Sequence, residues 1–166
     1  LRSETTVKVF DQMRKLQSYT DEGSPGRDWN VATGMVIEGK AGFQIMGDWA
    51  KGEFTAAGKV PGVDYYCAPT PSNNGYLYNV DSFIFYKTSD PEKQEGQKLL
   101  AKLMMGKNFQ KVFNLYKGSI PARLDVPMDE FDKCAKTSNS DIKTAGASGG
   151  LVPSFAHGMA QGNTMK

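Results

Sequence analysis

Side chains suited to binding a sugar stand at the ends of elements that the sequence predicts. Trp49 follows Gly47-Asp48, and Asn79 and Asp81 stand two residues apart in an aromatic stretch. Residues two apart lie on one face of a strand. An amide both donates and accepts hydrogen bonds, whereas a carboxylate only accepts, so this pair could hold two neighbouring hydroxyl groups. An indole face could cover the C–H surface of a sugar ring.

The same residues also admit other interpretations. Trp49 could pack in the core, and Asn79 and Asp81 could serve turns. A carbohydrate-active enzyme fragment is an alternative function, with Asp81 and a second carboxylate such as Asp48 as an acid–base pair about 5–10 Å apart. A general interaction module is a third, in which Trp49 would be buried away from any cleft. The residues by themselves leave these alternatives open.

Nucleophilic catalysis and metal binding find little support. His157 is the single histidine, and Ser154 precedes it by three residues, but no Gly-x-Ser-x-Gly elbow surrounds that serine. A serine at a helix start beside a satisfied or exposed histidine is the favoured interpretation. The glycine-rich segment 145–150 lacks the ending of a phosphate loop. No His, Cys and carboxylate cluster has metal-ligand spacing, so no metal or other cofactor is expected.

Cys67 and Cys134 are the two cysteines of the chain, and they could be free thiols or a disulfide. A bond between them would close a long loop, which is where the entropy model gives a disulfide its largest effect. Two cysteines without further thiols suit a secreted or periplasmic protein. The sequence leaves both states open.

Length and charge narrow the class of protein. The 166 residues are enough for one domain-sized core. Lys and Arg number 20 against 18 Asp and Glu, a net charge of +2, so no charge field argues for a nucleic acid partner or an anionic membrane. No apolar run approaches the roughly 20 residues of a membrane span. The chain starts at Leu1 and stops without a closing element, so we expect a piece of something longer.

Helical and strand patterns alternate, which predicts an α/β fold. Helices are predicted at 3–23, 30–38 and 49–57, from Asp90-Pro91 onward, and at 108–116, 129–136 and 153–161. Strands are predicted at 41–46, 63–68 and 76–86, and a flexible loop at 145–150. Asp48 and Asp90 are expected to cap helices. The long helix after Asp90 would bury Leu99, Leu100, Leu103 and Met104. Lys117, beside Gly118 at a helix end, is placed to face a cleft.

Residues 39–49 (Gly-Lys-Ala-Gly-Phe-Gln-Ile-Met-Gly-Asp-Trp) resemble the Glu-Gly-Lys-Ala-Ala-Met…Gly-Asp-Trp segment of extracellular solute-binding proteins, family 1, the receptors of sugar ABC transporters. The segments 65–71, 78–83 and 90–116, Ile120-Pro121 and 154–158 follow in that family's order. The resemblance therefore covers nearly the whole chain. It is nearest to the periplasmic glucose-binding members.

The resemblance implies a fold of two α/β lobes joined by a hinge, of the maltose-binding-protein-like type II. This chain would be the C-terminal portion of such a protein, incomplete at both ends. Residues 1–69 would be the first part of the second lobe, 70–121 would belong to the first lobe, and 122–166 would return to the second lobe. Sugar would lie in the cleft between the lobes.

The resemblance also implies the site and its use. Trp49 would stack on the sugar ring, Asn79 and Asp81 would hold adjacent hydroxyls, and Lys117 and His157 would donate to others. The protein would be a periplasmic receptor and not an enzyme, which captures a monosaccharide, glucose, and delivers it to the membrane subunits of an ABC importer. Its other partner would be the remaining N-terminal part of the same protein. Because half a cleft cannot exclude water, the chain alone is expected to bind sugar weakly or not at all.

Overall fold

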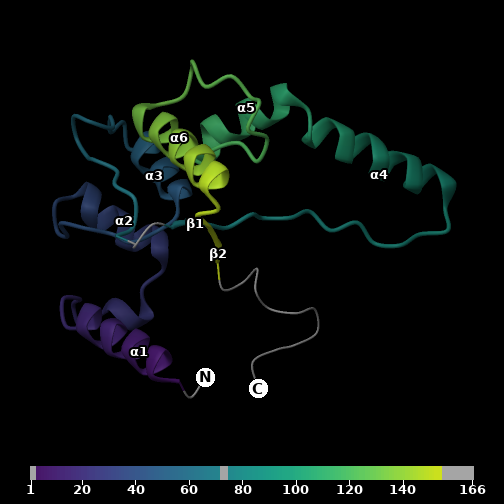
Figure 1. Ribbon diagram of the computed structural model, residues 1–166. Helices are drawn as coiled ribbons and strands as arrows, with labels where there is room; N and C mark the ends of the chain where they lie inside the picture. The colour runs from purple at the N-terminus through teal and green to yellow at the C-terminus, as the bar shows by residue number, and fades with distance from the viewer. Residues whose placement is uncertain (1–2, 72–74, 155–166) are drawn as a thin grey trace. The chain divides into compact units, whose positions relative to one another are not determined.

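The computed structural model describes residues 3–71 and 75–154 and divides into two units, Leu1–Gln44 and Ile45–Lys166 (Figure 1). The first unit contains α1 (Glu4–Gln17), the 3-10 helix η1 (Ser24–Gly26) and α2 (Trp29–Ile37). The second contains η2 (Asp48–Ala50), α3 (Lys51–Ala56), β1 (Tyr76–Tyr78), α4 (Pro91–Met104), α5 (Lys107–Lys117), α6 (Lys133–Ser148) and β2 (Leu151–Pro153). Each unit is described by itself.

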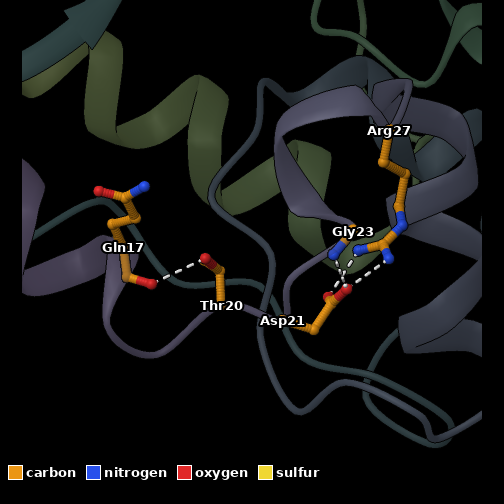
Figure 2. A network of polar contacts seen from close by, with 5 residues as sticks. All are labelled: Gln17, Thr20, Asp21, Gly23 and Arg27. Carbon is orange, nitrogen blue, oxygen red and sulfur yellow. Dashed lines mark hydrogen bonds and ion pairs between the residues drawn. The ribbon is translucent and has the colours of Figure 1, made fainter.

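In the first unit, α1 and the turn after it are held by polar contacts. Ser3 caps α1, because its hydroxyl accepts from the Thr6 N–H. After α1, the Asp21 carboxylate accepts from the Arg27 guanidinium at 2.6 and 2.7 Å and from the Gly23 N–H at 3.0 Å (Figure 2). The Arg27 guanidinium is the main cause that lowers the pKa of Asp21 to about 2. The predicted helix 3–23 therefore ends at Gln17, and a charged turn follows it.

The predicted strand 41–46 is wrong, since these residues are irregular. The Gln44 side chain instead turns back onto α2, where its Nε2 donates to the Trp29 carbonyl at 2.9 Å. Its Oε1 lies 2.8 Å from the hydroxyl of Thr33, which is fully buried. Alternating apolar residues make a strand only where a neighbouring strand takes up the backbone hydrogen bonds, and none lies beside this segment in the described residues.

In the second unit, β1 and β2 pair in parallel, with Tyr76 opposite Leu151 and Tyr78 opposite Pro153. Helix α6 packs against both strands (Figure 1). The hydroxyls of Tyr76 on β1 and Ser138 on α6 lie 2.5 Å apart. The described part of the chain therefore has helices and one small parallel sheet, which confirms the predicted mixture of helix and strand in this coarser form.

The core of the second unit lies around the start of α6. Val126, Phe131 and Ala135 are buried there. Leu115, Ile120 and Met128 pack on them. Asp132 caps α6 by accepting from the Ala135 N–H, and its other oxygen lies 2.8 Å from the buried Lys51 ammonium. Cys67 and Cys134 form a disulfide, which decides between the two states that the sequence left open.

Two other predicted strands are wrong or shorter than expected. Segment 63–68 makes only an isolated bridge between Pro61 and Tyr65 within the described residues. Side chains hold it instead, because Tyr65 stacks on Phe54 with ring centroids 4.1 Å apart and Cys67 is bonded to α6. The predicted strand 76–86 is confirmed only for β1, since its partner β2 is three residues long.

Several helix boundaries also differ from the prediction. The helix predicted at 129–136 starts later, at Lys133, and continues through the predicted loop 145–150 until Gly149, whose φ of 72° ends it. Pro153 lies in β2, so the helix predicted at 153–161 is wrong at its start, and its residues from 155 on lie outside the described ones. Helices α2, α4 and α5 lie where they were predicted, and Asp90 caps α4 through the Glu92 and Lys93 N–H groups.

Helix α4 does not bury the predicted stripe. Met104 is buried, but Leu99, Leu100 and Leu103 are exposed. Helix α4 packs against α5, and its Gln94 and Gln97 side chains donate to the carbonyls of Thr88 and Tyr86 in the segment before it. Of the helices in the described ranges, none has the length and apolar character to cross a membrane.

Candidate functional site

Three of the predicted site residues form one hydrogen-bonded group with a fourth residue. The Lys117 ammonium lies 2.7 Å from Asp81 Oδ2, and the Asn79 amide donates to Asp81 Oδ1 at 3.3 Å. The Ser154 hydroxyl donates to Asn79 Oδ1 at 2.8 Å. We call these four residues, Asn79, Asp81, Lys117 and Ser154, the Asp81 cluster. The structure thus brings together side chains from three separate parts of the sequence.

Two parts of the fold position the cluster. The parallel register of β1 and β2 continues one step beyond the strands, because the Ser154 N–H donates to the Tyr78 carbonyl at 2.8 Å. Asn79 and Ser154 are therefore neighbours at the ends of the two strands. Lys117 is the last residue of α5, which Gly118 ends with a φ of 87°. A side chain at position 118 would be strained and would also collide with the backbone of Gly52.

The electrostatics of the cluster keep its carboxylate charged and accessible. The Asp81 side chain is 69% exposed and that of Lys117 is 31% exposed. The hydrogen bond from Lys117, followed by its positive charge, lowers the pKa of Asp81. Lys117 Nζ also lies 5.8 Å from the centre of the Phe113 ring, a cation–π contact. The carboxylate is therefore an acceptor that a ligand can reach from solvent.

The donors and acceptors of the cluster suit neighbouring hydroxyl groups. Within the described residues, the hydrogen bonds to Asp81 use one N–H of the Asn79 amide and one of the three N–H groups of Lys117. Further N–H groups and the Asp81 oxygens can still bond to a ligand. Because a sugar hydroxyl both donates and accepts, it can give its proton to Asp81 and receive one from Lys117 or Asn79. An ordinary anion or cation would be matched by only half of this set.

Trp49 lies in η2, close in the chain to residues that contact the end of α5. The carboxylate of Asp48 accepts from the Ile120 N–H at 2.8 Å, so it does not cap the helix after Trp49 as predicted. Gly52 lies against the Lys117 carbonyl, since a Cβ there would approach its oxygen to 3.0 Å. The half-buried indole packs over Gly47, where a Cβ would overlap it. The segment that carries Trp49 is therefore fixed beside the end of α5 that carries Lys117.

His157, the fifth predicted site residue, lies outside the described residues. Ser154 is a cluster member that was not predicted as a site residue, because the sequence around this serine indicated the start of a helix. A local pattern could not have shown its role. That role follows from the pairing of two strands whose residues lie 75 positions apart.

The geometry does not favour the catalytic alternative. Asp48 is bonded to the Ile120 N–H and Asp81 to Lys117. A general acid needs a raised pKa, whereas Lys117 lowers that of Asp81. In the described ranges, no group of three or more His, Cys, Asp or Glu could hold a metal ion. The bonding of both carboxylates and the lowered pKa of Asp81 fit binding better than proton transfer.

Known proteins resemble this chain over nearly its whole length. A protein of Brucella suis described as a probable sugar-binding periplasmic protein is 47% identical over 167 residues, which cover 100% of this chain. An ABC transporter extracellular-binding protein of Pyrococcus horikoshii is 33% identical over 94% of the chain. A xylose/arabinose-binding protein of Haloferax volcanii is 28% identical over 93% of it. The chain spans 39%, 34% and 33% of the lengths of these three relatives.

The family and two of the relatives bear on the location of the protein, and the family bears on catalysis. The Brucella relative is described as periplasmic, and the Pyrococcus relative and the family as extracellular, which confirms the predicted localisation. Solute-binding proteins bind and do not catalyse, which confirms the prediction that the protein is not an enzyme. The family model of the bacterial extracellular solute-binding proteins matches residues 2–142. The chain therefore belongs to the bacterial extracellular solute-binding proteins.

Proposed function

We propose that this chain is part of a periplasmic receptor that binds a monosaccharide and delivers it to an ABC importer. The observation that carries the proposal is the Asp81 cluster, an exposed carboxylate flanked by an ammonium and an amide. The sugar-binding descriptions of the Brucella and Haloferax relatives support the ligand class, and that of the Pyrococcus relative supports the importer. Glucose is the sugar we propose, on the resemblance of segments 78–83 and 154–158 to glucose-binding members.

The proposed site has five members with separate tasks. Asn79 and Asp81 hold adjacent hydroxyls, and Lys117 and His157 donate to others. Trp49 stacks on the ring, since an indole face attracts the C–H surface of a sugar. Support for this set comes from the cluster itself and from the contacts that fix the segment of Trp49 beside α5. The importer would then recognise the closed, sugar-bound form.

We also propose the two-lobe arrangement for the whole receptor. Residues 1–69 and 122–166 belong to its second lobe and 70–121 to its first. A contiguous patch of exposed apolar residues often marks a surface that another protein part covers. Leu99, Leu103 and Val112 line an apolar groove between α4 and α5 and are exposed. The rest of the receptor, which the longer relatives possess, is the partner that we propose for this face.

The test is sugar binding by calorimetry with the full-length receptor, meaning this chain together with the remainder that its relatives have. Glucose should bind with a 1:1 stoichiometry and remain chemically unchanged, and galactose, mannose and xylose should bind more weakly. Asp81→Ala should weaken binding by roughly 100-fold, since hydrogen bonds to charged groups contribute about 1.5–3 kcal/mol each. The 166-residue chain alone should bind weakly or not at all.

A matched control separates the site from general effects on charge. Asp11 lies on α1 and is exposed, so Asp11→Ala removes the same charge from another part of the chain. This variant should bind glucose as the unchanged receptor does. Binding of none of these sugars would contradict the proposed function, and unchanged binding by Asp81→Ala would contradict the proposed site.

A further inference from the structure

We infer that Ser154 is a positioning residue for the sugar site, which acts by fixing the orientation of the Asn79 amide. The inference rests on the proposed function, since it concerns how that site presents its donors. Ser154 itself need not touch the ligand. Its contact is with Asn79 Oδ1, at 2.8 Å.

The backbone holds Ser154 in the place that this role requires. Tyr78 and Pro153 are the last paired residues of the parallel strands, and the Ser154 N–H extends the pairing by donating to the Tyr78 carbonyl. Asn79 directly follows Tyr78 and Ser154 directly follows Pro153, so the two residues lie side by side one step beyond the strand pair. The position of the hydroxyl depends on the strand pair and does not require a particular sequence around residue 154.

The hydrogen bonds on the two ends of the Asn79 amide specify the same orientation. Its oxygen accepts from Ser154, and its nitrogen donates to Asp81 Oδ1. Rotation of the amide by half a turn would place its oxygen against the Asp81 carboxylate. Both oxygens are hydrogen-bond acceptors, so no hydrogen bond could form between them. Ser154 therefore stabilises the orientation in which the NH₂ group lies on the side of the carboxylate.

The consequence reaches Asp81 and the ligand. Lys117 holds one Asp81 oxygen and Asn79 the other, so the carboxylate is fixed from both sides. The second N–H of the Asn79 amide is then available beside it for a sugar hydroxyl. Without the Ser154 hydroxyl the amide samples both orientations, and a fraction of the receptor presents an oxygen where the sugar needs a donor.

The experiment compares Ser154→Thr with Ser154→Val in the full-length receptor, because these side chains have nearly the same shape and differ in the hydroxyl. Calorimetry with glucose should give an affinity for Ser154→Thr within about twofold of the unchanged receptor. Ser154→Val should bind roughly 5- to 20-fold more weakly. Ser148 also has an exposed hydroxyl, which bonds within α6, so Ser148→Ala is a control that should leave binding unchanged.

A second measurement links the effect to Asn79. In an Asn79→Ala background, Ser154→Val should cause no further loss, because the group through which it acts is gone. The side-chain amide of Asn79, observed by nitrogen-15 NMR without sugar, should shift in Ser154→Val and return in Ser154→Thr. This readout does not depend on the ligand, so it can be made even if the proposed function fails.

The outcomes are distinguishable. If the unchanged receptor binds none of the sugars, the proposed function is wrong, and the NMR comparison of Ser154→Val with Ser154→Thr still decides whether Ser154 fixes the Asn79 amide. If it binds glucose, equal affinities of Ser154→Val and Ser154→Thr overturn the inference alone. An additive loss in the Asn79→Ala background also overturns it. Should Ser154→Val fail to fold, Ser154→Ala takes its place in each comparison.

Discussion

Lys117 and Asp81 form an ion pair of 2.7 Å although 36 positions separate them in the sequence. Lys117 ends a helix, and Asp81 lies three residues beyond the end of a strand. An exposed pair of this kind adds little to stability. The main effect of the pair is on the protonation of Asp81. Lys117 lowers the pKa of Asp81, so the carboxylate stays charged at a lower pH than an ordinary aspartate does.

The first prediction concerns this pKa. Asp81 has a lowered pKa in the folded protein, so the contribution of the pair is present above the ordinary pKa near 3.8 and is lost as the pH falls through the lowered value. Lys117→Met should raise the pKa of Asp81 toward 3.8. An NMR titration of the Asp81 carboxyl carbon measures this directly.

Lys98→Met is the control for that titration. Lys98 pairs with Glu95 on α4, so this substitution removes the same charge from a different ion pair. Lys98→Met should leave the midpoint of the Asp81 titration unchanged. Glucose binding by Lys117→Met should also weaken as the pH falls toward 4, where the unchanged receptor still binds. An Asp81 midpoint that does not move in Lys117→Met would show that Lys117 is not its cause.

The second prediction concerns Trp49. An aromatic contact contributes about 0.5–1.5 kcal/mol beyond the area that it buries, so Trp49→Leu should lower the affinity for glucose by roughly 2- to 10-fold. Trp29 is the other tryptophan of the chain and lies in α2. Trp29→Leu is therefore the matched control for calorimetry. Equal affinities of the two variants would remove Trp49 from the proposed site.

Some of these relationships could be predicted from the sequence, and the reasons are local. The spacing of Asn79 and Asp81 suggested that they act together, and they are hydrogen-bonded. Gly118 was predicted to end a helix, and it does so with a left-handed conformation that favours glycine. Asp90 before Pro91 was predicted to cap α4, and it does. Each of these features depends on residues within a few positions of one another.

The relationships that could not be predicted depend on distant parts of the chain. Segments 41–46 and 63–68 have strand-like composition, but they form no strand because no neighbouring strand pairs with them in the described residues. The helix predicted at 129–136 starts only at Lys133, because Asp132 caps it and also pairs with Lys51, which lies 81 positions away. Ser154 joins Asn79 only through the pairing of β1 with β2.

The third prediction concerns the disulfide between Cys67 and Cys134. The bond closes a loop with a sequence separation of 67, for which the chain-entropy model gives about 4 kcal/mol of stabilisation. The double variant Cys67→Ser, Cys134→Ser should therefore unfold at a clearly lower urea concentration in the full-length receptor. A reductant should shift the unchanged receptor in the same direction. The same reductant should not shift the double variant, and a midpoint shared by all samples would contradict the prediction.

The fourth prediction compares two aspartates that both cap helices. Asp132 also pairs with Lys51, whose side chain is 8% exposed, whereas Asp90 caps α4 at the surface. Asparagine is itself a good cap, so Asp90→Asn should change the free energy of unfolding by only a few tenths of a kcal/mol. Asp132→Asn leaves a buried ammonium without its carboxylate and should cost about 3–5 kcal/mol.

A further variant assigns that loss to the lysine. Replacing a buried pair by apolar groups is often neutral, so adding Lys51→Met to Asp132→Asn should recover much of the lost free energy of unfolding. Urea unfolding of the full-length receptor measures all three variants. If Asp132→Asn costs no more than Asp90→Asn, Asp132 is only a cap. If Lys51→Met makes Asp132→Asn less stable still, the loss comes from packing around Lys51 rather than from its unpaired charge.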